Sequence, residues 1–499
     1  MAYFGYITTL KNVRAHPNAD RMKLAECFGN TVCVSLDAAD GDVVIYFPTD
    51  GQLSVEYCEY NNLVRKKDEN GNNIGGYLDP DKRNIRAIKL RGEKSDGLVM
   101  PLESLAFCFE SNNPDVGVMN LSIGDRIDVV NGHEICKKYI PRSNPRRGSV
   151  SEGNKTRKKK VAVAPLFVEH ADTEQLAYNL GAFKPGDEIE ITLKMHGTSQ
   201  RTAYLPVIQP NRFHLEDSEL KSILLKFMPV SKWRNKLIDK WCTPIYDWGY
   251  VSGTRRTVLE NYDGGYYGSN EFREQHSKFF EGKLWKGEEV YYEVVGFTHT
   301  GAPIMASCDN KKLNDKDFIK QYGDTTTFSY GCLPFGFEVK EYEEPWVMPT
   351  MEFKPKSDIY VYRMTMTNED GDVVEYTPDF MRYRCEQMGV KTVPVLWNGI
   401  IPYTVDDLNS STPGARTILK NGENAGELIK EVAEIYYDGP DPVGKTHVRE
   451  GVVVRIINRP KFAAYKHKNF EFKCLEGIIK ANADAPDIEE AQDIENNEE

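Results

Sequence analysis

The stretch Asp187-Glu-Ile-Glu-Ile-Thr-Leu-Lys-Met-His-Gly197 alternates apolar and polar residues with a period of two. This alternation predicts a β-strand with one buried face, because successive side chains of a strand point to opposite sides. Lys194 falls on the polar face near the strand end, and Gly197 then allows a turn. A lysine beside other cations or apolar walls can lose its proton near neutral pH and become a nucleophile. Lys194 is therefore a candidate catalytic residue, unless it is an ordinary exposed lysine.

Three later segments combine a strand pattern with isolated charges. Glu289-Val-Tyr-Tyr-Glu293-Val-Val-Gly296 places a carboxylate inside an apolar strand, and Arg449-Glu450-Gly451-Val-Val-Val-Arg455 places one at a strand start. Phe462-Ala-Ala-Tyr-Lys466-His-Lys468 holds two lysines two residues apart, hence on one strand face. A bare buried carboxylate is costly, so Glu293 needs a partner if its strand is buried.

These four segments resemble, in the same order, the motifs of the covalent nucleotidyltransferase superfamily of ATP ligases and capping enzymes. They read Lys-x-His-Gly-Thr, Glu-x-x-Gly, Glu-Gly-Val-Val and Lys-x-Lys. Those proteins attack the α-phosphate of a nucleotide with a lysine and carry the nucleotide as a phosphoramide. The His-Gly form of the first motif looks most like the RNA ligase branch. The resemblance implies that Lys194 is the attacking amine, that ATP is the nucleotide, and that Mg or Mn is the divalent ion.

The resemblance gives roles to the other charged motif residues. Glu450 would lie near Lys194 and bind the divalent ion, which ligation needs because the leaving pyrophosphate accumulates charge. Lys466 and Lys468 would hold the α-phosphate and, as nearby like charges, lower the pKa of Lys194. The alternative for the pair is two exposed strand lysines.

The resemblance also implies a set of nucleotide-binding residues, which are His196, Gly197, Arg255, Glu293 and Tyr362. Arg255 belongs to a segment similar to the Ser-Arg element of the family, and Glu293 would bind a ribose hydroxyl unless it forms a structural salt bridge. Tyr362 would stack on the purine unless it is a core residue. Arg363 stands where the family usually has an acidic residue after the aromatic.

Residues 1–136 contain many short strand-like runs separated by turn signals, which predicts a small β-barrel. His16-Pro-Asn-Ala-Asp20 and Leu90-Arg-Gly-Glu-Lys-Ser-Asp-Gly97 resemble the two landmarks of tRNA-binding OB domains. The same module precedes the ligase domain in one RNA ligase family. Arg86, Lys89 and Arg91 would then place cations along a barrel edge that binds RNA. Alternatively, the two landmarks only stabilise the fold.

Charge is segregated along the chain, although the formal net charge is −12. Residues 137–160 hold ten Lys or Arg and one acid among Pro, Ser, Gly and Asn, which predicts a basic linker that binds phosphates or serves only as a solvated hinge. Residues 481–499 form an acidic tail that we expect to be disordered. Ten scattered cysteines and the lack of a signal or membrane-spanning pattern favour a cytoplasmic protein, and we expect a monomer.

Gly439-Pro-Asp-Pro-Val-Gly-Lys-Thr446 matches the phosphate-loop pattern, which requires a strand before it and a helix after it. The preceding segment, 425–437, reads as a helix, and residues 452–457 read as a strand, so the match is rejected.

The sequence predicts an α+β protein with an N-terminal OB-type barrel and a nucleotidyltransferase domain over residues 161–480, built of ATP-grasp-like antiparallel sheets with helices. The predicted function is ATP-dependent sealing of RNA 3′-hydroxyl and 5′-phosphate ends through lysyl-AMP, on nicked duplexes or tRNA-like ends. One alternative is a nucleic-acid-binding protein with an inactive ligase core. Another is a DNA-ligase or GTP-using capping relative, which His196 and the lack of room for a barrel after Lys468 disfavour.

Overall fold

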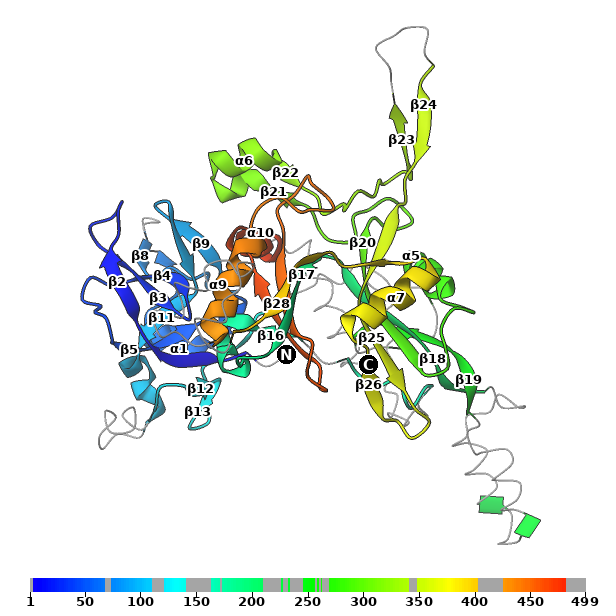
Figure 1. Cartoon of the computed structure of the whole chain (residues 1–499). Coiled ribbons are helices and arrows are strands. Elements are labelled where there is room, and N and C mark those ends of the chain that lie inside the picture. Colours follow the sequence, from blue (N-terminus) through cyan, green and yellow to red (C-terminus); the bar gives the residue numbers. More distant parts are fainter. Residues whose placement is uncertain are drawn as a thin grey trace.

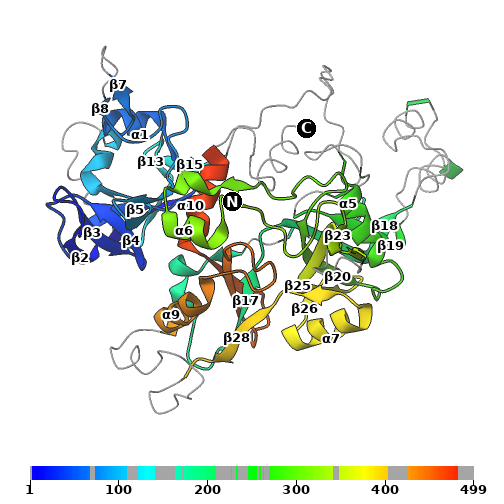
Figure 2. The same cartoon turned by 90° about the horizontal axis from the view of Figure 1, so that it is seen from above.

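The computed structural model describes residues 3–67, 73–109, 121–140, 163–170, 173–209, 226–227, 232–233, 246–255, 258–259, 262, 269–340, 348–402 and 425–481. It is a mixed α+β structure, as predicted. Figure 1 shows the N-terminal domain (blue and cyan) on one side and a large sheet (green and yellow) on the other. The C-terminal strands with α9 and α10 (orange and red) lie between them, and Figure 2 agrees from above. The predicted linker and tail lie largely outside the described residues, and the domain boundaries stay predictions.

The N-terminal domain is built from small sheets. One four-stranded sheet has the order β11 (Leu98–Pro101), β5 (Val43–Phe47), β1 (Gly5–Thr9) and β12 (Arg126–Ile127). A second sheet joins β2 (Lys11–Ala15), β3 (Lys23–Cys27) and β4 (Asn30–Val34). The two-stranded pairs are β9 (Ala87–Leu90) with β10 (Glu93–Asp96), β6 (Gly51–Leu53) with β15 (Cys136–Lys138), β7 (Lys66–Lys67) with β8 (Asn73–Gly75), and β13 (Val129–Val130) with β14 (His133–Glu134). The helical elements are α1 (Val55–Tyr60) and η1 (Leu102–Cys108).

The short strands predicted for this domain are present. The short strand-like runs are at 3–10, 31–36, 43–47, 85–89, 97–100 and 125–130, and each overlaps a strand of the structure. No sheet in the described residues closes into a barrel, because the strands are divided among several sheets. The OB-type closure therefore stays a prediction.

The first sheet of the C-terminal part contains the predicted lysine strand. Its order is β16 (Glu174–Gln175), β30 (Ala463–Lys468), β29 (Gly451–Ile456), β17 (Glu188–Lys194) and β28 (Val395–Ile400). The predicted apolar face of β17 points into the core, since Ile189 and Ile191 are fully buried. They pack with β29 and with Leu428 and Val432 of α9 (Ala425–Tyr437). The 3-10 helices η2 (Leu176–Tyr178) and η3 (Leu180–Ala182) lie before β17 in the chain.

The second sheet is the largest. Its order is β19 (Tyr246–Gly253), β18 (Thr198–Ile208), β20 (Glu288–Gly296), β25 (Ser357–Thr367) and β26 (Val373–Glu375), and β27 (Lys391–Thr392) also pairs with β25. Helices α5 (Glu271–Phe279) and α7 (Pro378–Met388) pack on it. Because β18 follows β17 after a short turn, the two sheets meet directly beside Lys194.

The remaining elements surround these sheets. They are β21 (Cys308–Asp309), η4 (Asn310–Leu313), α6 (Lys316–Tyr322), β22 (Thr325–Thr326), the hairpin β23 (Phe337–Lys340) and β24 (Thr350–Phe353), and α10 (Phe470–Ala481). The β23–β24 hairpin projects from the body in Figure 1. The rejected phosphate loop lies between α9 and β29, so it has a helix before it and a strand after it, as predicted. In the part of the chain that the structure describes, no helix has the length and apolar character needed to cross a membrane.

Candidate active site

Three strands of the first sheet bring the motif lysines to one face. Lys194 of β17 pairs in register with Gly451 of β29, and Gly451 pairs with Lys468 of β30. Since neighbouring strands are about 4.8 Å apart, the two lysine backbones lie about 10 Å apart across a residue without a side chain. A Cβ at Gly451 would lie 2.1 Å from the carbonyl oxygen of His467, so only glycine fits there. Lys466 precedes Lys468 by two residues and projects from the same face.

A buried carboxylate joins two of these lysines. Glu450 is 2% exposed, and its Oε1 lies 2.7 Å from Nζ of Lys194 and 3.7 Å from Nζ of Lys468. Its second oxygen, Oε2, lies 3.8 Å from Nδ1 of His196 and has no hydrogen-bond partner among the described residues. Glu450 thus faces two ammonium groups with one oxygen, while its other oxygen has no hydrogen bond among the described residues.

The two lysines of β30 differ in their protonation. Burial, together with the charges of Lys468 and Lys194, lowers the pKa of Lys466 to about 8. Burial alone would also lower the pKa of Lys468, but Glu476 and Glu450 raise that pKa well above its ordinary value. Lys468 therefore stays charged at neutral pH, whereas Lys466 loses its charge under mildly alkaline conditions.

The second sheet contributes polar groups beside the same turn. Ser199 of β18 pairs in register with Glu293 of β20, and its Oγ lies 3.1 Å from the hydroxyl oxygen of Tyr362. The register between β20 and β25 shifts between Tyr291 and Tyr292, which makes Tyr362 the extra residue of a β-bulge. Bulges re-aim side chains and are common next to active sites. The sheet thus brings Glu293, Ser199 and Tyr362 together near the lysine turn.

At Gly197, between β17 and β18, the backbone lies close against β20. A Cβ at this position would lie 2.4 Å from the carbonyl oxygen of Val294 and 2.9 Å from Cγ of Glu293. Glycine is therefore required for β20 to pass directly behind the turn that follows Lys194. This explains the Gly of the first motif by packing alone.

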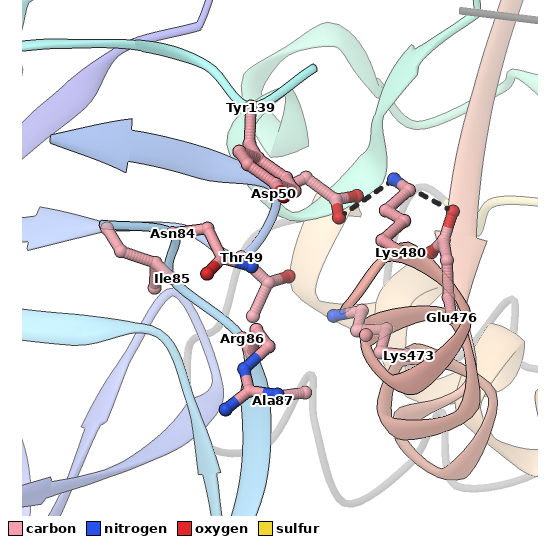
Figure 3. Close-up of a pocket in the computed structure, with 11 residues that line it drawn as sticks. Thr49, Asp50, Asn84, Ile85, Arg86, Ala87, Tyr139, Lys473, Glu476 and Lys480 are labelled. Atoms are coloured by element: carbon pink, nitrogen blue, oxygen red, sulfur yellow. Dashed lines mark hydrogen bonds and ion pairs between the residues drawn. The ribbon is translucent and has the colours of Figure 1, made fainter. Parts of the chain in front are cut away.

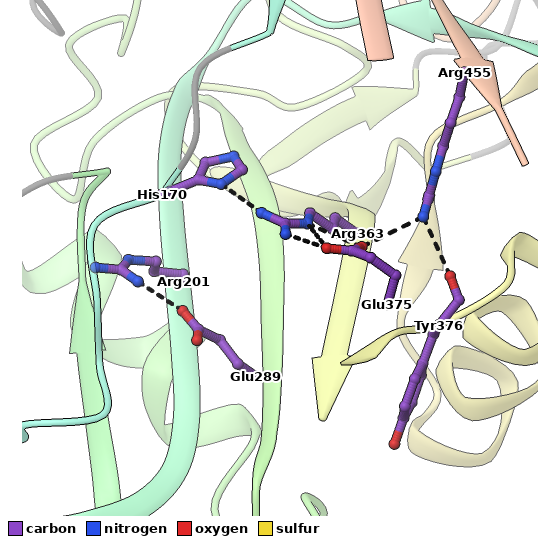
Figure 4. A network of polar contacts seen from close by, with 7 residues as sticks. All are labelled: His170, Arg201, Glu289, Arg363, Glu375, Tyr376 and Arg455. Atoms are coloured by element: carbon purple, nitrogen blue, oxygen red, sulfur yellow. Dashed lines mark hydrogen bonds and ion pairs between the residues drawn. The ribbon is translucent and has the colours of Figure 1, made fainter. Parts of the chain in front are cut away.

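A polar network ties the two sheets together (Figure 4). Arg363 of β25 forms an ion pair with Glu375 of β26, and its guanidinium donates to Nδ1 of His170 at 2.8 Å. Arg455 of β29 lies 3.5 Å from the same carboxylate and donates to the carbonyl of Tyr376 at 3.2 Å. Arg363, the departure from the family pattern, thus cross-links the sheets through Glu375.

Two neighbouring groups complete this network. Burial, followed by the charges of Arg363 and Arg255, lowers the pKa of His170 to about 2, so His170 is neutral and accepts from Arg363. Arg201 of β18 lies 2.8 Å from Glu289 of β20, and both side chains are buried (Figure 4). The network holds the second sheet in place beside the lysines.

The predicted nucleotide-binding residues lie on both sheets. His196 donates its backbone N–H to the hydroxyl of Tyr330 at 2.6 Å, and its ring packs edge-on against Phe328 and Phe472. Arg255 lies just after β19, and its backbone carbonyl accepts a hydrogen bond from the backbone N–H of His170 at 3.1 Å. The neighbouring Arg256 lies outside the described residues. The roles of all the predicted site residues stay predictions.

Two of the three predicted RNA-binding residues lie close to α10. Lys89 of β9 forms ion pairs with Asp315 and, at 3.0 Å, with Glu471, and the side chain of Arg86 packs along the α10 backbone at Gly477. Contact of Lys89 with RNA would therefore require these ion pairs to open. Arg91 donates to the carbonyl of Asn18 at 3.2 Å.

Hydrogen bonds join the two segments that resemble the OB landmarks. Nε2 of His16 lies 3.1 Å from the carbonyl of Leu90, and the side-chain amide of Asn18 donates to the carbonyl of Arg91 at 3.0 Å. His16 is buried. These contacts give both landmarks a structural role, and their contact with RNA stays a prediction.

Several residues of the site were not singled out from the sequence. Tyr330 and Glu476 contact the motif residues His196 and Lys468, but neither belongs to a motif. Tyr330 lies between β22 and β23, and Glu476 follows the last motif. His170, which accepts from Arg363, also belongs to none of the motifs.

The chemistry of Glu450 fits a divalent cation. Its Oε2 is buried without a hydrogen bond among the described residues, and such an oxygen is the ligand that Mg²⁺ or Mn²⁺ prefers. Across the described residues, no group of three or more His, Cys, Asp or Glu is arranged to hold a metal. A site with one carboxylate, completed by phosphate oxygens and water, is common for Mg²⁺.

The fold is similar to that of solved RNA ligase structures. A mutant of RNA ligase from Naegleria gruberi with AMP and Mn matches with a TM-score of 0.51 and 14% identity, over 96% of this chain and 99% of that chain. The same ligase with PPi gives a TM-score of 0.49 at 14% identity, over 94% and 97%. No family model and no curated protein matches the chain. The first match shows that the chain shares the overall fold of that RNA ligase structure.

We expect Gly197→Ala to disturb the site through packing. The added methyl group would collide with β20, and overpacking of this kind costs about 1–3 kcal/mol. Thermal unfolding should show a lower midpoint for Gly197→Ala than for Gly181→Ala, since a Cβ at Gly181 meets nothing within 4 Å. Equal midpoints for the two variants would contradict the close approach.

Proposed function

We propose that the protein is an ATP-dependent RNA ligase that seals 3′-hydroxyl and 5′-phosphate ends through a lysyl-AMP intermediate. The observation that carries the proposal is the contact of Lys194 with the buried Glu450, beside Lys466 and Lys468 on the same sheet face. The fold supports it, because the similar Naegleria gruberi structure is that of an RNA ligase with AMP and Mn.

The first step uses the amine of Lys194. After it has lost its proton, its lone pair attacks the α-phosphorus of ATP, a P–N bond forms, and the bond to the pyrophosphate oxygen breaks. Pyrophosphate leaves with the bonding electrons, and AMP remains on Nζ. Lys468, which stays charged, and Lys466 would neutralise the α-phosphate as charge develops on its oxygens.

The next two steps pass the AMP on. A 5′-phosphate oxygen of the RNA attacks the phosphorus of lysyl-AMP, which releases the lysine and gives an AMP-capped RNA end. The 3′-hydroxyl then attacks the 5′-phosphorus, a phosphodiester bond forms, and AMP leaves. The N-terminal domain, as an OB-type module with the interlocked landmarks, would hold the RNA.

A divalent ion fits beside the lysine. Glu450 would hold Mg or Mn through Oε2, and the ion would supply charge stabilisation for the phosphates and the leaving group. Glu293 and Tyr362 would bind the ribose and the base, together with His196, Gly197 and Arg255. We also propose that the protein acts as a monomer in the cytoplasm.

Labelling with radioactive nucleotide tests this function. After incubation with α-labelled ATP and Mg, the wild-type chain should retain label on denaturing electrophoresis, and Lys194→Ala should not. Lys311→Ala is the control, because Lys311 is an exposed lysine that forms a surface ion pair with Asp324. This variant should be labelled like the wild type. Label from GTP alone would favour a capping-type relative, and no label from either nucleotide would favour a binding protein with an inactive core.

The low pKa of Lys466 predicts how nucleotide binding depends on pH. Below about pH 8 Lys466 is charged and attracts the phosphate, and above it the charge is lost, so AMP affinity should fall by up to about tenfold per pH unit. Arginine stays charged throughout this range, so Lys466→Arg should bind AMP with little change from pH 7 to 9.5. Calorimetric titration measures both proteins. The same alkaline loss in both would show that Lys466 does not contact the phosphate.

A further inference from the structure

Helix α10 lies between the N-terminal domain and the nucleotidyltransferase core (Figure 1). Phe472, Leu475 and Ile479 pack into the core cluster that contains Leu193 and Met195. Phe470 and Cys474 pack with Ala87 of β9 in the N-terminal domain. One helix thus packs against both parts of the protein, and it begins two residues after Lys468.

A chain of alternating charges runs along this helix from the site into the N-terminal domain. Glu450 is followed by Lys468 at 3.7 Å, and Nζ of Lys468 donates to both oxygens of Glu476 at 2.8 Å. Lys480 lies 3.2 Å from Glu476 and 3.0 Å from Asp50. Figure 3 shows the ammonium of Lys480 between the two carboxylates.

This chain of alternating charges is shielded from solvent for most of its length. The side chains of Glu450, Glu476 and Lys480 are 2%, 7% and 3% exposed. The cavity between α10 and the N-terminal domain, lined in part by Asp50 and Arg86, has a volume of about 10 Å³, which is room for about one water molecule (Figure 3). Charges in such surroundings interact more strongly than at the surface.

We propose that Glu476 is a positioning residue for nucleotidyl transfer, which holds the Lys468 ammonium away from Glu450 and is itself anchored through Lys480 to Asp50 of the N-terminal domain. The inference rests on the proposed function and deepens it. It makes the docked N-terminal domain part of the support of the lysine site, in addition to its proposed role in holding RNA.

Glu476 has this role because Lys194 and Lys468 compete for the same carboxylate, that of Glu450. Lys194 and Lys468 both face Oε1, at 2.7 and 3.7 Å, and the longer distance is kept because Glu476 holds Lys468 with two short hydrogen bonds. Without the Glu476 charge, Glu450 becomes the nearest carboxylate for Lys468, which would move toward it and displace Lys194. The fixed geometry of nucleophile and phosphate-binding lysine would then be lost.

The test compares Glu476→Gln with Asp96→Asn in the full-length protein. Asp96 forms a second interdomain ion pair with α10, through Lys473 at 2.6 Å, but this pair does not continue to the lysine site. The rate of self-adenylylation is measured with Mg over a range of labelled ATP concentrations, which gives the maximal rate and the half-saturating ATP concentration. Glu476→Gln should lower the maximal rate by about 10- to 100-fold, as for other residues that orient a first contact, with a smaller change in the half-saturating concentration. Asp96→Asn should keep both wild-type values.

If Glu476→Gln does not fold, as judged by thermal unfolding, Asp50→Asn replaces it. Asp50 is 34% exposed and is the last member of the chain of charges, farthest from the lysine site. This variant should show a smaller loss in the same direction, and a maximal rate equal to that of Asp96→Asn would overturn the proposal. A wild-type maximal rate in a folded Glu476→Gln would overturn it as well. Absence of label in the wild type itself would instead refute the proposed ligase function.

Discussion

The contact between Lys194 and Glu450 is the interaction on which the rest of the structure depends. A carboxylate that is 2% exposed is stable only if cations or hydrogen-bond donors surround it, because its desolvation is expensive. Here the surrounding cations are the lysines that the proposed chemistry needs. The same charges therefore serve both folding and the site, and removal of one partner would leave another buried charge without compensation.

Two glycines make this arrangement possible. Gly451 leaves the position between Lys194 and Lys468 without a side chain, and Gly197 lets β20 pass behind the lysine turn. The two sheets are then fixed relative to each other by Arg455 and Arg363, which share Glu375. The site thus depends on backbone packing at two points and on a buried ion network beside it.

Much of the fold could be predicted from the sequence because local patterns determine it. The period-two alternation of β17 and the spacing of Lys466 and Lys468 on β30 predicted strands that the structure contains. The OB-type closure is not confirmed, since the register between distant strands leaves no local signal. The pairing of Lys89 with Asp315 joins residues far apart in the chain, and charge alone suggested an exposed cation. Glu476 was missed for the same reason, because its partner is defined only when α10 folds back beside β30.

The central claim is that Lys194 is the amine that becomes covalently bound to phosphorus. Mass spectrometry of proteolytic peptides tests it most directly, after incubation of the wild-type chain with ATP and Mg under conditions that preserve phosphoramides. The account predicts one added AMP, located by fragmentation on Lys194. AMP on Lys466, Lys468 or another residue, or unmodified peptides throughout, would contradict it.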